Sequence, residues 1–338
     1  MATQPLVTVL IDTYNYGQFI EEAIESVLAQ EFAAEQVEII VVDDGSTDDT
    51  AERVKKFGAL VRYVLKPNGG QASAFNVGFV QARGAIVALL DADDYWLPGK
   101  LRRVVEEFEK HPEAGMVYHR LQEFDMRSGQ RRDGAFTAIS GFVTKKREDL
   151  LRYVLYPTSA LAFRRRWVEK LLPIPEGLRI QADSHLSGLI IFVAPVVAVE
   201  ESLAVYRVHG GNLFHSPGAE FSAERTRRRV ATFAILAEGM KAWLAANGID
   251  VGQRDVRAFF AQWELTREAD EFTLETPGRW RMCRHLWRYN YYFAARLSWR
   301  HMAVNYLNAL GALVVGYRHL HLVDDWIAAA KRMGRRAG

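Results

Sequence analysis

Short apolar runs alternate with amphipathic segments over the first third of the chain. Each run is nearly continuous in Val, Ile and Leu, as expected of strands buried on both faces. The runs are Val7–Ile11, Val37–Val42, Leu60–Leu65 and Ile86–Leu90. Between them, the spacing of apolar residues predicts helices near 19–28, 48–57 and 71–82. The alternation predicts βαβ units around a mostly parallel, Rossmann-like sheet.

The pattern changes twice further along the chain. After about residue 115 it loosens into shorter elements. Strands are expected at Met116–His119, Ser159–Phe163 and Val196–Tyr206, and helices at Arg164–Leu172 and Asp183–Phe192. From about Ala219 the pattern is almost wholly helical, with breaks near residues 248, 252 and 276–278. We therefore predict an α/β domain over 1–218, divided near residue 115, and an all-helical region over 219–338.

Composition places the chain among ordinary globular proteins. Of its 338 residues, 49% are hydrophobic and 25% charged. A single cysteine, Cys283, excludes a disulfide framework and fits a reducing cytosol. The first residues lack the pattern of a signal peptide, and the most apolar segment, Met302–Tyr317, is too short and too polar to span a membrane. A cytoplasmic location is expected.

Charge is distributed unevenly. Residues 1–220 carry 24 Lys/Arg against 30 Asp/Glu, whereas residues 221–338 carry 19 against 11. Arginines interleave with aromatic residues between Arg279 and Arg300. Such a region either packs on the protein or a second subunit, or rests on the inner face of the cell membrane. Nucleic acid is not expected as a partner.

Three carboxylates follow the last of the four strands, in Asp91-Ala92-Asp93-Asp94. Like charges at the end of a buried strand repel one another, and burial adds to the cost. A divalent cation shared with substrate phosphates would offset it, and carboxylates suit Mg²⁺ or Mn²⁺. The alternative is an acidic turn in which an aspartate caps a helix that begins near Pro98.

The loops after the other strands should share the same edge of the sheet, where α/β proteins bind ligands. Asp12–Gly17 offers aromatic rings that can stack on a base, and Asp43–Asp48 a carboxylate that can accept the imino N–H of uracil or thymine. Asn68-Gly69-Gly70 precedes a helix, so its N–H groups could meet an anion or a ribose. Each loop taken alone is equally compatible with capping or edge packing.

Together the four loops resemble the family-2 glycosyltransferases with a GT-A fold. The matching stretches are Val9–Asn15, Val41–Asp48, Asn68–Gly70 and Leu90–Asp94, in the family's order and spacing. The resemblance is strong over about 5–115 and looser to about 215. It implies a GT-A nucleotide-diphospho-sugar transferase domain at 1–218, with a nucleotide-binding half (1–115) and an acceptor half (116–218). One departure is Asp12, which stands where many members carry Pro.

The resemblance also implies roles for individual residues. Those expected to hold the donor are Asp12, Thr13, Tyr14, Asp44, Gly70, Asn76, Asp91 and Ala92. Asp93 is expected to bind a Mg²⁺ or Mn²⁺ that bridges the diphosphate. Such an ion would neutralise the leaving nucleoside diphosphate.

Two further stretches match the family less closely. Asp183 takes the place of the general base that deprotonates the acceptor, although Ala182 stands where members often carry an acid. The alternative for Asp183 is an N-cap of the following helix. Tyr206–His209 resembles a Tyr-Arg-x-His stretch, in which His209 would be a further metal ligand and Arg207 would meet phosphate.

The expected function is metal-dependent transfer of one sugar, with inversion, from a UDP- or dTDP-sugar to an acceptor hydroxyl. The acceptor, a sugar, lipid-linked or protein group, would belong to surface polysaccharide or glycoconjugate synthesis. The Gln-x-x-Arg-Trp motif of processive relatives is absent, because Phe163 and Thr276 stand at the Gln position. One alternative is a non-catalytic nucleotide-sugar-binding scaffold. Another is a sugar-nucleotidyltransferase, which the lack of a basic residue in Asp12–Gly17 disfavours.

Overall fold

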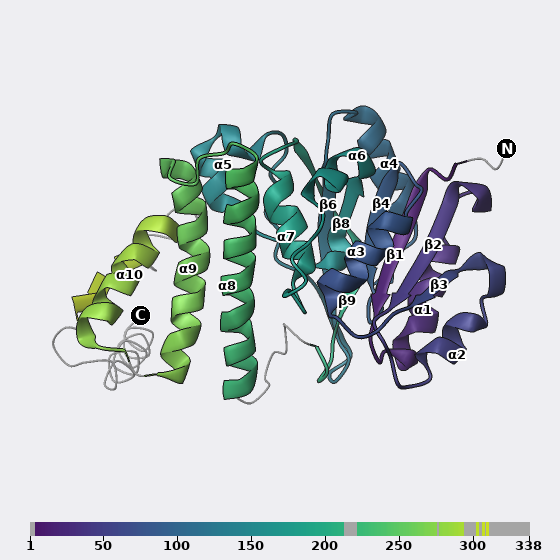
Figure 1. Cartoon of the computed structure of the whole chain (residues 1–338), viewed down its shortest axis with the longest axis horizontal. Coiled ribbons are helices and arrows are strands. Elements are labelled where there is room, and N and C mark those ends of the chain that lie inside the picture. Colours follow the sequence, from purple (N-terminus) through teal and green to yellow (C-terminus); the bar gives the residue numbers. More distant parts are fainter. Residues whose placement is uncertain are drawn as a thin grey trace, which may run out of the picture. The chain divides into compact units, whose positions relative to one another are not determined.

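The computed structural model describes residues 4–212, 222–275, 277–293 and six residues between 302 and 310 (302, 303, 306, 307, 309 and 310). The chain divides into two compact units. The first comprises Met1–Asp149, Tyr153–Glu220 and Glu238–Ile249. The second comprises Leu150–Arg152, Phe221–Ala237 and Asp250–Gly338. Figure 1 shows the α/β elements of the first unit and the long helices that follow.

The first unit is built on a nine-stranded sheet within the described residues, and its first half is parallel. The strands of that half are β1 (Val7–Thr13), β2 (Val37–Asp43), β3 (Arg62–Leu65) and β4 (Ile86–Asp91), in the order β3-β2-β1-β4. β1, β2 and β4 are almost wholly buried, as their apolar runs predict. The expectation of burial on both faces is wrong for β3, whose residues are half-buried or exposed because it is the first strand in the sheet order, with only β2 beside it among the described strands.

The second half of the sheet mixes directions. Its strands are β5 (Tyr95–Trp96), β6 (Met116–Asp125), β7 (Gln130–Asp133), β8 (Leu161–Arg164) and β9 (Val196–Val208). β8 is antiparallel to both β4 and β6, whereas β6 and β9 are parallel. The short strands β5 and β7 were not expected from the sequence. The sheet is thus parallel over one half and mixed as a whole, which refines the expectation of a mostly parallel sheet.

Helices connect the strands of this unit, as the amphipathic segments predict. They are α1 (Gly17–Leu28), α2 (Thr50–Lys55), α3 (Gln71–Gln81), α4 (Lys100–Lys110), α5 (Arg147–Arg152), α6 (Arg165–Val168) and α7 (Ala182–Ile190). Short 3₁₀ turns include η4 (Thr158–Ala160), which leads into β8. α1 buries Phe19, Ile20, Ala23, Ile24 and Val27, which follow helical spacing in the sequence, whereas Leu28 at the end of the same apolar face is exposed.

The helical C-terminal region is confirmed. Its described helices are α8 (Ala223–Ala246), α9 (Arg254–Leu274) and α10 (Arg279–Phe293). They are separated near Gly248 and Gly252 and again near Pro277, where the sequence predicts breaks. None of the helices in the described part of the chain combines the length and the hydropathy that crossing a membrane requires. Most of Met302–Tyr317 lies outside the described residues.

Gly84 lies where the turn before β4 crosses the start of β1. Its N–H donates to the buried Thr8 hydroxyl at 2.8 Å. A Cβ at Gly84 would lie 2.3 Å from the Thr8 nitrogen and 2.6 Å from the Val7 carbonyl carbon. These are backbone atoms, so no side-chain rotation relieves the clash. The position requires glycine so that β1 and β4 can pair in register.

We expect Gly84→Ala to lower the free energy of unfolding by about 1–3 kcal/mol, as overpacking does elsewhere. Thermal unfolding followed by circular dichroism measures the change. Gly278→Ala is the control, because a Cβ there meets no atom within 4 Å among those described. Equal melting temperatures for the two variants would show that β1 and β4 are not held this closely.

Candidate active site

The carboxyl ends of β1 and β4 bring two aspartates side by side. The parallel register places Asp12 opposite Asp91. The Ala92 N–H donates to the Asp12 carbonyl at 3.2 Å, and the Asp94 N–H returns to the Asp91 carbonyl at 3.0 Å. The chain therefore turns tightly after β4, and Ala92 itself is buried. This turn gathers the acidic side chains at one edge of the sheet.

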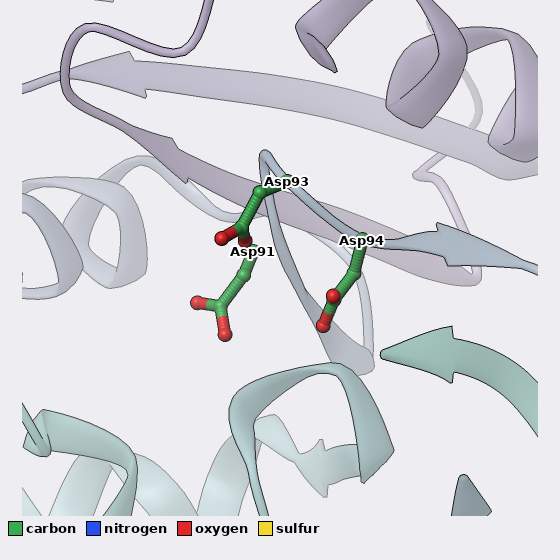
Figure 2. A group of neighbouring side chains, drawn as sticks. All are labelled: Asp91, Asp93 and Asp94. Atoms are coloured by element: carbon green, nitrogen blue, oxygen red, sulfur yellow. The ribbon is translucent and has the colours of Figure 1, made fainter. Parts of the chain in front are cut away.

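Asp91, Asp93 and Asp94 each present a carboxylate oxygen within 4.8 Å of the others (Figure 2). Asp94 is fully buried, and both its oxygens are occupied: one accepts from the Ser159 hydroxyl at 2.6 Å and the other from the Arg207 N–H at 2.9 Å. Asp94 therefore fixes the turn. The N-cap of α4 is Gly99, without a side-chain cap, so the helix-capping alternative for the acidic run is wrong.

Asp93 and His209 contact each other directly. The His209 Nε2 lies 3.0 Å from the Asp93 Oδ2. The Gly211 N–H donates to the His209 Nδ1 at 3.1 Å, so in the neutral ring Nε2 is the nitrogen that donates to Asp93. The rings of Tyr16 and Phe19 pack against the imidazole at centroid distances of 6.0 and 5.0 Å. The two residues predicted to bind a metal thus lie together.

Arg207 lies beneath this pair, 3% exposed. Its Nη1 donates to the Asp93 carbonyl oxygen at 3.1 Å, and its Nη2 forms an ion pair with Glu22. The guanidinium also lies over the rings of Phe19 and Tyr95. These contacts hold the Asp93 turn, and the phosphate contact expected of Arg207 stays a prediction.

Asp12 and Asp91 are neighbouring acids that share a hydrogen bond. Burial, with the neighbouring Asp93 charge, raises the pKa of Asp12 from 3.8 to about 7, although its hydrogen bond with Asp91 opposes the rise. Burial and the charges of Asp12 and Asp93 raise the pKa of Asp91 well above its ordinary value. The Asp12 Oδ1 is buried without a hydrogen-bond partner among the described residues. Without a cation, the pair therefore holds a proton near neutral pH.

Asp183 is joined to the acidic turn by a bridge of two neutral side chains. The Gln71 amide nitrogen lies 3.3 Å from both the Asp91 Oδ1 and the Thr158 hydroxyl, and its carbonyl oxygen accepts from the Ala182 N–H at 3.0 Å. The Thr158 hydroxyl donates to the Asp183 Oδ2 at 3.2 Å. We call this set the Gln71–Thr158 bridge. It holds the start of α7 to the carboxyl end of β4.

Asp183 itself is buried, and burial raises its pKa to about 6. It is the second residue of α7, its Oδ1 accepting from the adjacent Ser184 N–H at 2.7 Å. The N-cap is Gln181, in a left-handed conformation without a side-chain cap, so the capping alternative for Asp183 is wrong. A carboxyl with this pKa can take a proton near neutral pH.

The other predicted donor residues differ in accessibility. Tyr14 is 46% exposed, and the buried Thr13 hydroxyl has no partner among the described residues. Asp44 is engaged: its Oδ1 accepts from the Gly69 N–H at 2.8 Å and from the Lys66 ammonium at 2.6 Å, and its Oδ2 from the Gly70 N–H at 2.6 Å. The expectation that these glycine N–H groups are free for an anion is therefore wrong.

Gly70 and Asn76 both serve packing in this structure. A Cβ at Gly70, whose φ is +89°, would lie 2.5 Å from the Arg179 Cα. The Asn76 amide donates to the Ile174 carbonyl at 2.9 Å and accepts from the Ile174 N–H at 2.8 Å. Asn76 thus ties α3 to the segment before α7, and its expected contact with the donor stays a prediction.

Several residues of the site escaped the sequence interpretation. Gln71, Thr158, Ser159 and Tyr16 all bond to the acidic residues or to groups that hold them. Burial and a hydrogen bond with Asp93 raise the pKa of Tyr16 well above its ordinary value. The place of Gln71, directly after paired glycines at a helix start, is the one signal that could have found it. Thr158 and Ser159 follow no pattern.

The sequence matches known proteins over most of its length. Residues 8–172 match the family model described as glycosyl transferase family 2. An uncharacterised glycosyltransferase of Nostoc sp. is 37% identical over 255 residues, which are 72% of this chain and 76% of that protein. An uncharacterised protein of Mycobacterium tuberculosis is 29% identical over 285 residues, 79% of this chain and 75% of that protein.

Solved structures share the fold at lower identity. S. aureus TarS 1–349 in complex with UDP aligns with a TM-score of 0.62 at 17% identity, covering 92% of each chain. The mannosyltransferase PcManGT of Pyrobaculum calidifontis, in complex with GDP-Man and Mn²⁺, aligns with a TM-score of 0.52 at 20% identity, covering 97% of this chain and 86% of that one. The predicted GT-A-like α/β fold with a helical C-terminal region is confirmed.

Removing the acid of Asp12 should make stability less sensitive to pH. The folded-state pKa is about 7 against 3.8 for the free group, so between these values the folded state binds more protons and the free energy of unfolding falls as pH rises. In the presence of a metal chelator, the melting temperature of wild type should fall as the pH rises from about 5 to about 8. The expected fall is about 2–4 °C for each kcal/mol of unfolding free energy that is lost. Asp12→Asn should show a smaller fall. Asp133→Asn, an exposed change on β7, should behave as wild type.

Differential scanning calorimetry across this pH range measures the slopes. Equal slopes for wild type and Asp12→Asn would show that Asp12 does not hold a proton in the folded state.

Proposed function

The chain belongs to glycosyltransferase family 2, and from this premise we propose that it moves one sugar, with inversion, from a nucleotide-diphosphate sugar to an acceptor hydroxyl with the aid of Mg²⁺ or Mn²⁺. One observation carries the proposal. Asp91 and Asp183, which lie on separate elements, are joined by the Gln71–Thr158 bridge at the carboxyl edge of the sheet. A donor held at the acidic turn would then lie within reach of the base.

The donor is proposed to be UDP- or dTDP-linked. TarS was solved with UDP and with UDP-GlcNAc, which supports a uridine nucleotide, whereas PcManGT was solved with GDP-Man. In this chain Tyr14 would stack on the base, and Thr13 offers a hydroxyl without a protein partner among the described residues. Asp12 and Asp44 would contact the nucleoside. Both oxygens of Asp44 already accept hydrogen bonds from the protein, so Asp44 would accept a further one from the nucleoside.

The donor set at the acidic turn fits a divalent cation. Three carboxylates and an imidazole lie together with few compensating charges, and Asp94 is already occupied. Asp93 and His209 would hold the ion and Asp91 would support it. When bound, Mg²⁺ or Mn²⁺ would stabilise the negative charge of the departing nucleoside diphosphate. Arg207 holds the main-chain carbonyl of Asp93, and Tyr16 bonds to its side chain, so both help keep Asp93 in place for this role.

Asp183 is proposed as the general base. Its carboxylate would take the proton of the acceptor hydroxyl while that oxygen attacks the anomeric carbon from the side opposite the leaving group, which gives inversion. Thr158 donates to the Asp183 Oδ2 and thereby orients the carboxylate. Burial keeps the pKa of Asp183 near 6, which makes it a stronger base than an exposed aspartate while leaving it ionised at pH 7.

The acceptor is proposed to belong to surface polysaccharide or glycoconjugate synthesis, where it is a sugar, lipid-linked or protein hydroxyl. Transfer of a single sugar is favoured because the Gln-x-x-Arg-Trp motif is missing at both candidate places, Arg166-Trp167 and Arg279-Trp280.

The metal assignment is tested by Asp93→Ala. We expect Mn²⁺ to increase the thermal stabilisation of wild type by UDP, because a ligand that binds the folded state stabilises it by about 2.7 kcal/mol at 100 times its Kd. Asp93→Ala should lose this metal-dependent part, together with hydrolysis and transfer of the donor sugar. Asp133→Ala is the matched control on an exposed strand. Full activity in Asp93→Ala would overturn the assignment. UDP binding without metal or turnover in wild type would instead indicate a scaffold.

The base assignment is tested by Asp183→Asn. We expect kcat to fall by about 10²–10⁴, as on removal of a general base, with little change in the KM of the donor. In wild type, kcat should rise with pH through about 6 as Asp183 ionises.

Thr158 offers a matched pair for the same test. Thr158→Ser keeps the hydroxyl and should preserve the dependence of kcat on pH. Thr158→Val removes the hydroxyl and should shift the apparent pKa of that dependence. Activity and a pH profile unchanged in Asp183→Asn would remove Asp183 from the mechanism.

A further inference from the structure

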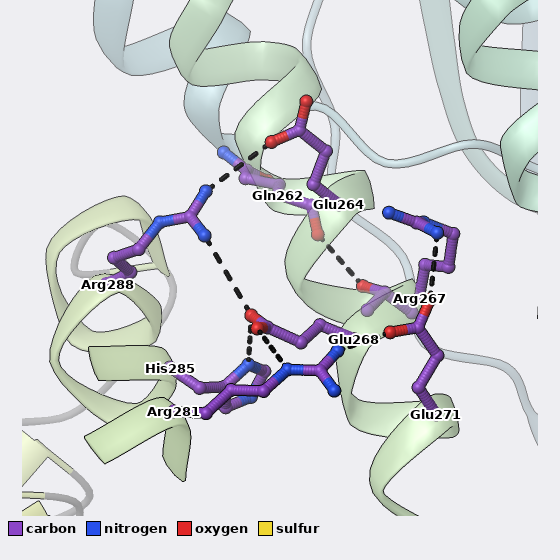
Figure 3. Close-up of polar contacts among 9 residues, drawn as sticks. Gln262, Glu264, Arg267, Glu268, Glu271, Arg281, His285 and Arg288 are labelled. Atoms are coloured by element: carbon purple, nitrogen blue, oxygen red, sulfur yellow. Dashed lines mark hydrogen bonds and ion pairs between the residues drawn. The ribbon is translucent and has the colours of Figure 1, made fainter. Parts of the chain in front are cut away.

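The α9–α10 pair in the second unit is joined by a network of ion pairs that determines which side of α10 faces inward. Glu268 of α9 is buried and receives three groups of α10: Arg281 Nε at 3.4 Å, His285 Nδ1 at 3.0 Å and Arg288 Nη1 at 3.8 Å. Arg281 and Arg288 also reach Glu271 and Glu264 of α9, at 2.6 and 3.4 Å (Figure 3). These two arginines are therefore neutralised within the unit.

The remaining side of α10 presents aromatic residues and an unneutralised arginine. Trp280, Arg284, Trp287 and Tyr291 recur at i, i+4, i+7 and i+11, so they fall within roughly 60° of one another around a helix with 3.6 residues per turn. We call them the aromatic–arginine stripe. Trp280 is 78% exposed, Trp287 58% and Tyr291 54%, while Met282 and His285 on the opposite side are buried.

The positive charge around the stripe favours an anionic partner. α10 contains no Asp or Glu, and residues 279–338 hold eleven Lys/Arg against two Asp. Within the described residues, Arg284 forms no ion pair. The stripe also continues into apolar groups: Tyr306 packs edge-on against Trp287 at 5.0 Å, and Leu307 and Leu310 are 58% and 59% exposed.

We propose that the aromatic–arginine stripe binds the surface of an anionic membrane. Tryptophan and tyrosine rings favour the level of lipid headgroups, where the ring enters the boundary and its polar edge stays hydrated. Arginines beside them attract anionic headgroups, each contributing about 1 kcal/mol near the surface. An amphipathic helix with these two properties lies in the plane of the interface and does not cross it. The proposal is independent of the sugar and the acceptor.

Binding of the full chain to lipid vesicles tests the proposal. Wild type should co-sediment with vesicles of phosphatidylcholine and phosphatidylglycerol, more weakly at high salt, and poorly with phosphatidylcholine alone. Trp280→Ser with Trp287→Ser should weaken binding by about tenfold or more. Arg284→Gln should weaken it by about fivefold, which is the loss of about 1 kcal/mol. Leu60→Ser with Arg62→Gln, exposed residues of the first unit, is the matched control and should bind as wild type.

Quenching by brominated lipid provides a second measurement that does not depend on loss of binding. Trp280→Phe with Trp287→Phe should keep vesicle binding but lose most of the quenching of tryptophan fluorescence. Circular dichroism and melting temperature check that each variant is folded.

Three results would overturn the proposal. The first is absence of wild-type binding to anionic vesicles, or binding that the stripe variants do not change. The second is a wild-type dimer that Trp280→Ser with Trp287→Ser converts to monomer without any vesicle binding, which would assign the stripe to a second copy of the chain. The third is tight, salt-sensitive binding of single-stranded RNA through the same residues in place of lipid.

Discussion

The site depends on holding several carboxyl groups together at the end of two buried strands. Asp12 lies in β1, Asp91 ends β4, and Asp93 and Asp94 lie in the turn after β4. Asp183 lies close enough for its charge to raise the pKa of Asp12. Such a group is stable only where each member has a hydrogen bond, a proton or a cation. Asp94 has hydrogen bonds from Ser159 and Arg207, and Asp12 and Asp91 hold a proton between them. Asp93 relies on His209, Tyr16 and, in the proposed reaction, on a metal.

The scaffold meets this requirement with segments far apart in the sequence. Ser159 lies in the turn η4 before β8, Arg207 lies near the end of β9, His209 follows β9, and Gln71 starts α3. Lys100, fully buried behind the turn, donates to the Ser159 carbonyl at 2.7 Å, and burial lowers its pKa well below the ordinary value. The antiparallel return of β8 between β4 and β6 is what brings Ser159 to the Asp91 N–H. The mixed half of the sheet thus supports an acidic turn that belongs to the parallel half.

The sequence predicts the elements that local residue patterns determine. It does not predict the contacts that form when segments distant in sequence fold back onto one another. The strands β1, β2 and β4 follow from apolar runs, and the common edge of their loops follows from parallel connections. Pairing of Asp93 with His209 could be anticipated because both lie in recognisable motifs. Engagement of Asp44 by Gly69 and Gly70 could not, since it depends on how the third loop folds back onto the second. Gln71 and Thr158 were missed for the same reason, because their partners lie on elements distant in sequence.

The side-chain amide of Gln71 has an acceptor end and a donor end, and its neighbours determine which way each end points. The Ala182 N–H can only donate, so it requires the carbonyl oxygen of Gln71, and the NH₂ group must then point toward Asp91 and Thr158. Glutamate has nearly the same shape, yet it would lose the two N–H donors and place another acid against Asp91. Shape alone does not define this position: its polarity does. An amide whose two ends differ in this way lets a neutral residue, with Thr158, link Asp91 to Asp183, so that the two carboxyl groups are held in fixed positions without adding charge to either.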